Sequence, residues 1–236
     1  MFKVAIVGAG SWGTALAHVA AKNNNSTHLW VRRRELADEM INTGENTQYL
    51  PCAKISPKIH ISTDLEHVVS DADIVIMAVP SHTIRNMAKL IRNFIKKDAI
   101  VTSASKGIEL GSLKRMSQVL AEELDNIRQE NIVALSGPSH AEEVIRNLPT
   151  AIVAASSEQE AAQKVQDALI NSNFRVYTNT DIIGVELGGA LKNIIAICSG
   201  ISDGLGLGDN TRAALMTRGI VEITRLGVQL GASPAT

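Results

Sequence analysis

The strongest constraint on the fold is a glycine pattern close to the start of the chain. Residues 2–7 form a short apolar run typical of a buried strand, and residues 8–13 read Gly-Ala-Gly-Ser-Trp-Gly. Residues 14–20 then have the composition of a helix. A G-x-G-x-x-G pattern between a strand and a helix is typical of the turn that opens a dinucleotide-binding βαβ unit. A glycine turn with a purely structural role is the alternative.

Each glycine of this pattern has its own physical reason. Gly8 permits the tight turn, Gly10 lets the backbone approach a pyrophosphate, and Gly13 lets the helix pack closely on the strand. The N-terminus of the following helix has unpaired N–H groups and a partial positive charge, which together stabilise an anion. The pattern therefore predicts that the chain binds NAD or NADP, with no lysine needed in the turn.

A second strand is expected at 27–31, and the residues that follow it bear on whether NAD or NADP is bound. An acidic residue usually binds the ribose hydroxyls at this point, but the chain has Arg32, Arg33 and Arg34 there. Guanidinium groups pair well with a 2′-phosphate, so we expect NADPH to be accepted. A solvated charge cluster ahead of Glu35 is the alternative, and NADH therefore stays open.

Short β-branched runs alternate with helical stretches, which is typical of a parallel sheet covered by helices. We expect strands at 2–7, 27–31, 73–79, 99–103, 131–135, 150–155 and 174–178. Strand-like runs then stop, and glycine-punctuated helix continues to about residue 230. We predict an α/β fold, with a Rossmann-type doubly wound, mostly parallel sheet over residues 1–184. Residues 185–236 are expected to begin a mainly α-helical substrate domain that is cut short.

Composition narrows the function classes. The formal net charge is −1, so no basic surface is expected to hold a nucleic acid. The chain starts with a strand in place of a signal peptide, and no segment approaches the roughly 20 uninterrupted apolar residues that cross a bilayer. Cys52 and Cys198 form no metal or disulfide pattern, which suits a reducing compartment. We therefore expect a cytoplasmic protein with no membrane span and no metal site.

Two further strand ends carry candidate site residues, because ligands of open α/β sheets bind beside the carboxyl ends of strands. Pro80 ends the strand at 73–79, and its backbone is placed to border the nicotinamide ribose. An ordinary strand-ending proline is an equally good interpretation. Lys106 follows the strand at 99–103 at the mouth of the expected cleft, where it would suit an anionic substrate.

Lys192 lies inside the otherwise apolar stretch 186–196 and is the candidate catalytic residue. Burial lowers the pKa of a lysine toward the range useful for proton transfer, and a ketone that accepts hydride needs a proton donor at its oxygen. The alternative is a lysine whose stem covers apolar surface while its amine reaches water.

Five motifs, in this order, resemble the bacterial type of NAD(P)-dependent glycerol-3-phosphate dehydrogenase. They are GAGSWGTA at 8–15, SKG at 105–107, SGPSHAEE at 136–143, GVELGGALKN at 184–193, and the segment 203–219. The resemblance implies reduction of dihydroxyacetone phosphate to sn-glycerol 3-phosphate, which supplies glycerophospholipid synthesis. It also implies a role for particular residues: the cofactor would contact Ser11, Trp12, Arg32, Arg33, Tyr49, Lys106 and Ala141, and the substrate would contact Lys106, Gly137, Ser139, Lys192 and Asn193. Lys192 would donate the proton, and Asn193 would orient it or a substrate hydroxyl, with helix packing as the alternative role.

The resemblance also has limits. The family continues beyond Thr236 through residues that grip the substrate phosphate, so we expect the C-terminal part of the family pattern to be missing from this chain. Two other functions stay open: another two-domain NAD(P)-dependent hydroxyacid dehydrogenase, and a non-catalytic dinucleotide-binding redox sensor. The sequence also leaves a homodimer open.

Overall fold

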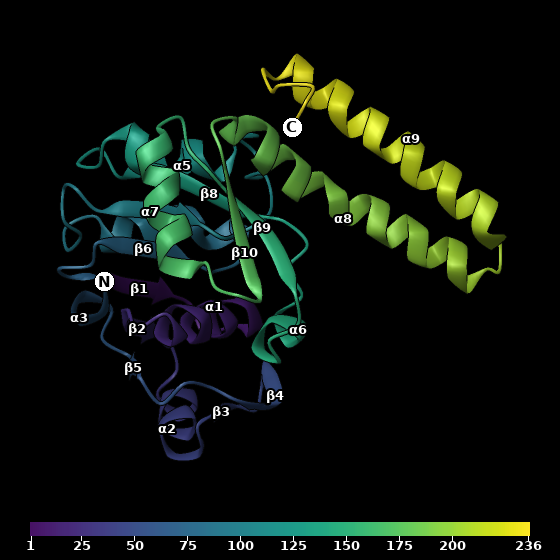
Figure 1. The fold of residues 1–236 in the computed structure, drawn as a ribbon. Helices are drawn as coiled ribbons and strands as arrows, with labels where there is room; N and C mark the ends of the chain where they lie inside the picture. Colours follow the sequence, from purple (N-terminus) through teal and green to yellow (C-terminus); the bar gives the residue numbers. More distant parts are fainter.

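The computed structural model describes residues 1–236, and an eight-stranded sheet organises most of them (Figure 1). The strands of this sheet are β1 (Lys3–Val7), β2 (Ser26–Trp30), β5 (Ile59–Ser62), β6 (Ile74–Met77), β7 (Ile100–Ser103), β8 (Ile132–Ser136), β9 (Thr150–Ala155) and β10 (Phe174–Asn179). Their spatial order is β10-β9-β8-β7-β6-β1-β2-β5. A separate hairpin pairs β3 (Glu45–Asn46) with β4 (Leu50–Lys54).

Helices cover both faces of the sheet. They are α1 (Ser11–Lys22), α2 (Arg34–Thr43), α3 (Leu65–Val69), α4 (Ile84–Ile91), α5 (Met116–Glu123), α6 (Ala141–Ile145) and α7 (Gln159–Leu169), with short 3₁₀ helices η1 (Ser81–Thr83) and η2 (Gln129–Asn131). Val4 and Ile6 of β1 pack with α1, α6 and α7, whereas Ala5 and Val7 pack with α3, α4 and α5. Because both faces are buried, the central strands are continuous apolar runs.

The predicted Rossmann-type fold with a mostly parallel sheet is confirmed. All pairings in the large sheet are parallel except that of β8 with β9. The strand order reverses between β1 and β6, since β2 lies on one side of β1 and β6 on the other. Such a switch point opens a crevice at the carboxyl ends of the strands, where ligands bind.

All seven predicted strands are present, with ends shifted by a few residues at most. The prediction missed β5, as well as the β3–β4 hairpin. The strand β5 has only four residues, two of them polar, and it pairs with β2 alone at the edge of the sheet. An edge strand needs no continuous apolar run, so its sequence carried little signal.

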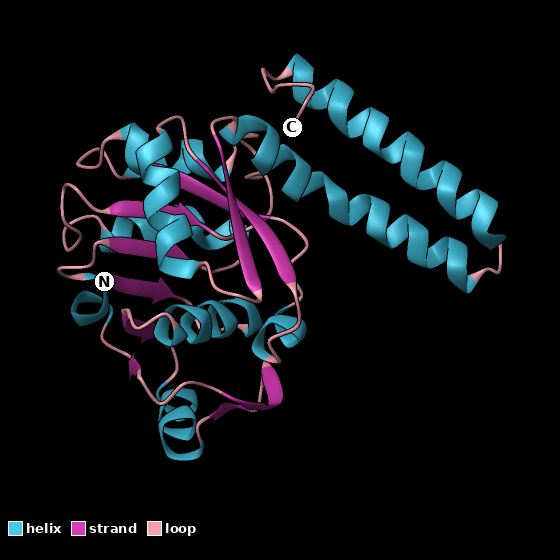
Figure 2. Cartoon of the chain, viewed as in Figure 1, coloured by secondary structure: helices cyan, strands magenta, loops and turns pink.

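Two long helices, α8 (Ile182–Gly204) and α9 (Gly208–Gln229), form an antiparallel hairpin that projects from the sheet (Figure 2). Asp181 caps α8, and its Oδ1 accepts a hydrogen bond from Gly184 N at 2.9 Å. The tight turn between the helices uses Gly206 and Gly208, both at positive φ (67° and 80°). The predicted change to helix near residue 185 is confirmed.

By length and composition alone, α8 is apolar enough to cross a membrane. Its 23 residues include three charged ones, Glu186, Lys192 and Asp203, so the expectation that no segment has about 20 uninterrupted apolar residues holds. One such helix is weak evidence for a span. Much of its apolar surface is exposed beyond the sheet, including Ile194, Ile197 and Ile201.

Candidate functional site

A groove of about 510 Å³ lies beside the carboxyl ends of β1, β2 and β6. This volume is in the range of small-molecule and cofactor sites. Its lining includes six residues predicted to bind the cofactor, namely Gly8, Gly10, Arg32, Arg33, Tyr49 and Pro80. The groove lies at the switch point in strand order, where a dinucleotide is expected.

The glycine turn has the tight geometry that the motif requires. Gly8 adopts φ +112°, and a Cβ there would lie 2.6 Å from the backbone oxygen of Ala78. A Cβ on Gly13 would lie only 1.9 Å from the oxygen of Gly8. Gly10 differs, because a Cβ there would meet no protein atom within 4 Å. Gly8 and Gly13 are thus needed by the fold itself, whereas Gly10 leaves open space at the start of α1.

Asn46 braces this turn, and the sequence did not suggest it. The residue is fully buried, and its Nδ2 donates to Ala9 O at 2.9 Å and to Thr14 Oγ1 at 2.8 Å. Its Oδ1 accepts from Tyr49 N at 3.2 Å. Asn46 therefore joins the glycine turn to the segment that brings Tyr49 to the groove. A single asparagine in a short hairpin carries no pattern by which it could have been found.

Residues between the end of β6 and the first turn of α4 were also missed as groove residues. Ala78, Val79, His82, Thr83, Asn86 and Met87 line it. Only Pro80 was selected from this region, although the rule that ligands bind at strand ends could have identified its neighbours. Among the other predicted cofactor contacts, Ser11 and Trp12 begin α1, and Ala141 is a buried residue that begins α6. Their contacts with a cofactor stay predictions.

Arg32 and Arg33 are exposed at the rim of the groove. Arg33 donates to Gln48 Oε1, and its guanidinium lies 6.0 Å from the ring centroid of Tyr49. Neither arginine is paired with a carboxylate. Both positive charges are therefore available to an anionic group of a ligand.

Replacing Arg32 and Arg33 with alanine is expected to weaken NADPH binding about tenfold or more, and NADH binding much less. Each lost charge-assisted hydrogen bond to a 2′-phosphate is worth about 1.5–3 kcal/mol, and NADH has no such phosphate. Equilibrium titration with each cofactor measures both losses. Arg34→Ala is the matched control, because this exposed arginine lies outside the groove and approaches only Asp38, at 4.0 Å. Equal losses for both cofactors would show that the arginines do not read the phosphate.

A second cluster lies at the ends of β7 and β8 and contains the predicted substrate residues. Lys106 Nζ donates to Ser139 Oγ at 2.6 Å, and Ser139 Oγ donates to Gly137 O at 3.3 Å. The same amine lies 5.8 Å from the ring centroid of Trp12, in the glycine turn. The structure therefore brings Lys106, Gly137 and Ser139 together, and Trp12 joins this cluster to the dinucleotide motif.

Burial, and then the charge of Lys192, lower the pKa of Lys106 to about 8. The two amines are thus close enough to interact, although they come from different elements. The helix α8 reaches this position because Gly189 packs on β8, where a Cβ would lie 2.2 Å from Ser136 Oγ and 3.9 Å from Lys106 Cγ. A larger residue at 189 would push α8 away from Ser136 and Lys106.

The surroundings of Lys192 differ from the expectation of a buried charge. Lys192 is half-buried and Asn193 is exposed, because α8 leaves the sheet after Gly189. Lys192 therefore lies on a part of α8 that is largely open to solvent, three residues beyond the contact of Gly189 with β8. The structure does not pair Asn193 with any side chain, and its role in orienting the substrate stays a prediction.

Comparison with known proteins adds to this geometry. The N-terminal domain model of NAD-dependent glycerol-3-phosphate dehydrogenase matches residues 3–162, and the C-terminal domain model of the same family matches residues 181–236. This chain belongs to that family. The expectation that the C-terminal part of the family pattern is missing was wrong for residues 181–236, which carry it.

Curated members of the glycerol-3-phosphate dehydrogenase family are identical to this chain at about half of the aligned residues. The glycerol-3-phosphate dehydrogenase [NAD(P)+] of Moorella thermoacetica is 53% identical over 233 residues, which is 99% of this chain and 68% of the relative. That of Bacillus subtilis is 52% identical, over 100% of this chain and 68% of the relative. The crystal structure of the Coxiella burnetii enzyme has a TM-score of 0.91 at 39% identity, covering 98% of this chain and 70% of that one.

Proposed function

We propose that this protein reduces dihydroxyacetone phosphate to sn-glycerol 3-phosphate with NADPH or NADH, and so supplies glycerophospholipid synthesis. The observation that carries the proposal is the position of Lys106, which donates to Ser139 Oγ at 2.6 Å and lies 5.8 Å from the ring centroid of Trp12. The helix α8, which carries Lys192, packs close to the same lysine at Gly189. Two positive charges at the mouth of a cofactor site suit a small anionic ketone. Family membership and the names of relatives at about 50% identity support the same reaction.

Lys192 and Lys106 have different roles in the proposed reaction. The nicotinamide, when bound, supplies hydride to the carbonyl carbon of the substrate. Protonated Lys192 gives a proton to the oxygen as negative charge develops there, and the neutral amine takes it back in the reverse direction. Lys106, held by Ser139, attracts the anionic substrate and keeps it in line with the cofactor.

The pKa of Lys106 leads to a prediction about pH. Lys106 is charged below about pH 8 and loses its charge above it, so the KM for dihydroxyacetone phosphate should rise as the pH increases through this value. Steady-state assays between pH 6.5 and 9.5, a range chosen to bracket that transition, measure the rise. Lys106→Arg keeps its charge throughout and should abolish the pH dependence of KM. A wild-type KM that stays flat across this range would contradict the role of Lys106.

The reaction is tested by following NADPH oxidation by the purified protein with dihydroxyacetone phosphate, and by identifying the product. Formation of sn-glycerol 3-phosphate supports the proposal. Turnover of a hydroxyacid or its keto form, without turnover of the keto-phosphate, would indicate the hydroxyacid dehydrogenase. Tight NADPH binding without turnover of any ketone would indicate the redox sensor.

Three narrower statements belong to the same proposal. A cytoplasmic location is inferred from the isolated cysteines, both of them free. The division into a dinucleotide domain at 1–184 and a substrate domain from 185 is supported by the position of α8, which begins at Ile182. Sedimentation analysis of the purified protein distinguishes a homodimer from a monomer.

A further inference from the structure

Glu186 in the first turns of α8 makes three polar contacts with a different part of the chain. Its carboxylate accepts from Arg115 Nη1 at 2.5 Å, from Ser117 Oγ at 2.5 Å and from Ser117 N at 2.7 Å. The side chain is only 8% exposed, and that of Arg115 is 16% exposed. The carboxylate of α8 thus caps the first turn of α5 and neutralises an arginine beside it. The mechanism described above uses neither residue.

Arg115 is the last residue of the segment that carries Lys106, and Ser117 lies in the first turn of α5, which follows it. This segment runs from β7 to α5 and folds back on itself, with Glu109 N donating to Lys114 O at 2.9 Å and a bridge between Ile108 and Arg115. Because of this fold, one end of the segment follows Lys106 closely and the other contacts Glu186. We call residues 104–115 the Lys106 loop.

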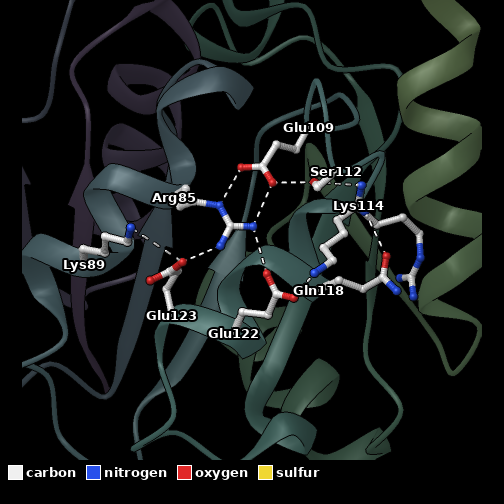
Figure 3. A network of polar contacts seen from close by, with 9 residues as sticks. Arg85, Lys89, Glu109, Ser112, Lys114, Gln118, Glu122 and Glu123 are labelled. Atoms are coloured by element: carbon white, nitrogen blue, oxygen red, sulfur yellow. Dashed lines mark hydrogen bonds and ion pairs between the residues drawn. The ribbon is translucent and has the colours of Figure 1, made fainter.

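The Lys106 loop is also anchored on its other side. Arg85 of α4 makes a two-pronged contact with Glu109, with Nε–Oε1 at 2.8 Å and Nη2–Oε2 at 2.7 Å (Figure 3). Arg85 also pairs with Glu122 and Glu123 of α5, so one arginine binds three glutamates. The loop is therefore held rigidly against α4 and α5, which makes it a fixed base for a contact with α8.

Close to this base, the buried side chains of Val185 and Leu187 also hold the start of α8. Gly189 packs on Ser136, and the helix becomes mostly exposed beyond it. Lys192 lies six residues after Glu186, which is about 9 Å along a helix axis. A change of angle at Glu186 would therefore displace the amine of Lys192 relative to Lys106. A displacement of about 1 Å in a catalytic group can cost on the order of 100-fold in rate.

We propose that Glu186 is a positioning residue, whose carboxylate joins α8 to the Lys106 loop and so sets the distance between Lys192 and Lys106. The inference rests on the proposed function for its effect on catalysis. Its effect on the two amines is independent of any substrate. Since the charge of Lys192 helps to lower the pKa of Lys106, a greater separation of the amines should let that pKa rise.

The test compares Glu186→Gln with the wild-type protein. The amide keeps the shape but leaves Arg115 without its counter-charge, so we expect kcat to fall about tenfold or more and NADPH affinity to stay within about twofold. The KM transition should also move to higher pH. Glu222→Gln is the matched control, because Glu222 pairs only with Arg218 and Arg225 on the exposed face of α9. It should match the wild-type protein in every readout.

A measurement without substrate separates this inference from the proposed function. NMR of proteins with isotope-labelled lysines follows the titration of Lys106 directly, and Glu186→Gln should shift its midpoint upward. If dihydroxyacetone phosphate is not reduced but this shift occurs, the proposed function fails and the positioning role stands. An unchanged midpoint and an unchanged kcat in a folded variant would overturn the positioning role.

Ser117→Ala provides a second route if Glu186→Gln does not fold. It removes the hydroxyl that donates to Glu186 and accepts from Arg115, and it keeps the ion pair of Glu186 with Arg115. We expect a smaller change in the same direction, about two- to fivefold in kcat, with no loss of NADPH affinity. A folded Ser117→Ala protein with wild-type kcat and wild-type Lys106 titration would also overturn the proposal.

Discussion

Replacing Lys192 with alanine is expected to lower kcat by about 10²- to 10⁴-fold, while NADPH affinity stays close to that of the wild-type protein. The amine is half-buried beside Lys106 and lies outside the groove that the dinucleotide is expected to fill. Its loss should therefore remove proton donation and leave cofactor binding intact. Single-turnover and steady-state kinetics measure the first effect, and fluorescence titration with NADPH measures the second.

Lys192→Arg is the informative companion to this variant. Arginine keeps the positive charge but holds its proton too tightly to donate it. If proton transfer is the role of Lys192, the arginine variant should bind substrate well and turn over nearly as slowly as the alanine variant. If attraction of the anionic substrate is the main role, arginine should restore most of the rate. A Lys192→Ala protein that keeps half of its turnover would end the catalytic assignment.

Two alanine substitutions in the glycine turn are expected to separate folding from cofactor binding. In Gly13→Ala the new Cβ would lie 1.9 Å from Gly8 O, a backbone atom that cannot move without shifting the turn. We expect a loss of about 3–5 kcal/mol in the free energy of unfolding, as for other severe clashes in a core. Thermal unfolding measures this as a large drop in Tm.

Gly10→Ala should show the opposite result. Gly10 has φ −71°, which alanine adopts freely, and its Cβ would meet no protein atom within 4 Å. The Tm should therefore stay near that of the wild-type protein. The methyl group would occupy the space left for the pyrophosphate, so NADPH affinity should fall about tenfold or more. A Gly10→Ala protein that binds NADPH normally would show that the pyrophosphate does not approach this turn.

Sequence patterns predicted most strands and the glycine turn, because the types of a few neighbouring residues specify such elements. The β-branched runs identified seven of the eight strands of the large sheet, and the glycine motif identified the turn between β1 and α1. The asparagine brace at Asn46 and the edge strand β5 were missed, since neither has a periodic signal. The resemblance to the family assigned Lys106, Gly137 and Ser139 to the substrate, and the structure brings these three residues together.

The sequence by itself determined the fold class, the place of the dinucleotide groove and the identity of the two lysines. Only the tertiary structure decided how they meet. Lys106 and Ser139 are 33 positions apart, and Arg115 and Glu186 are 71 apart. Lys192 turned out half-buried because α8 leaves the sheet. Contacts of this kind depend on the packing of whole elements against one another, and a local pattern of residue types contains no information about that packing.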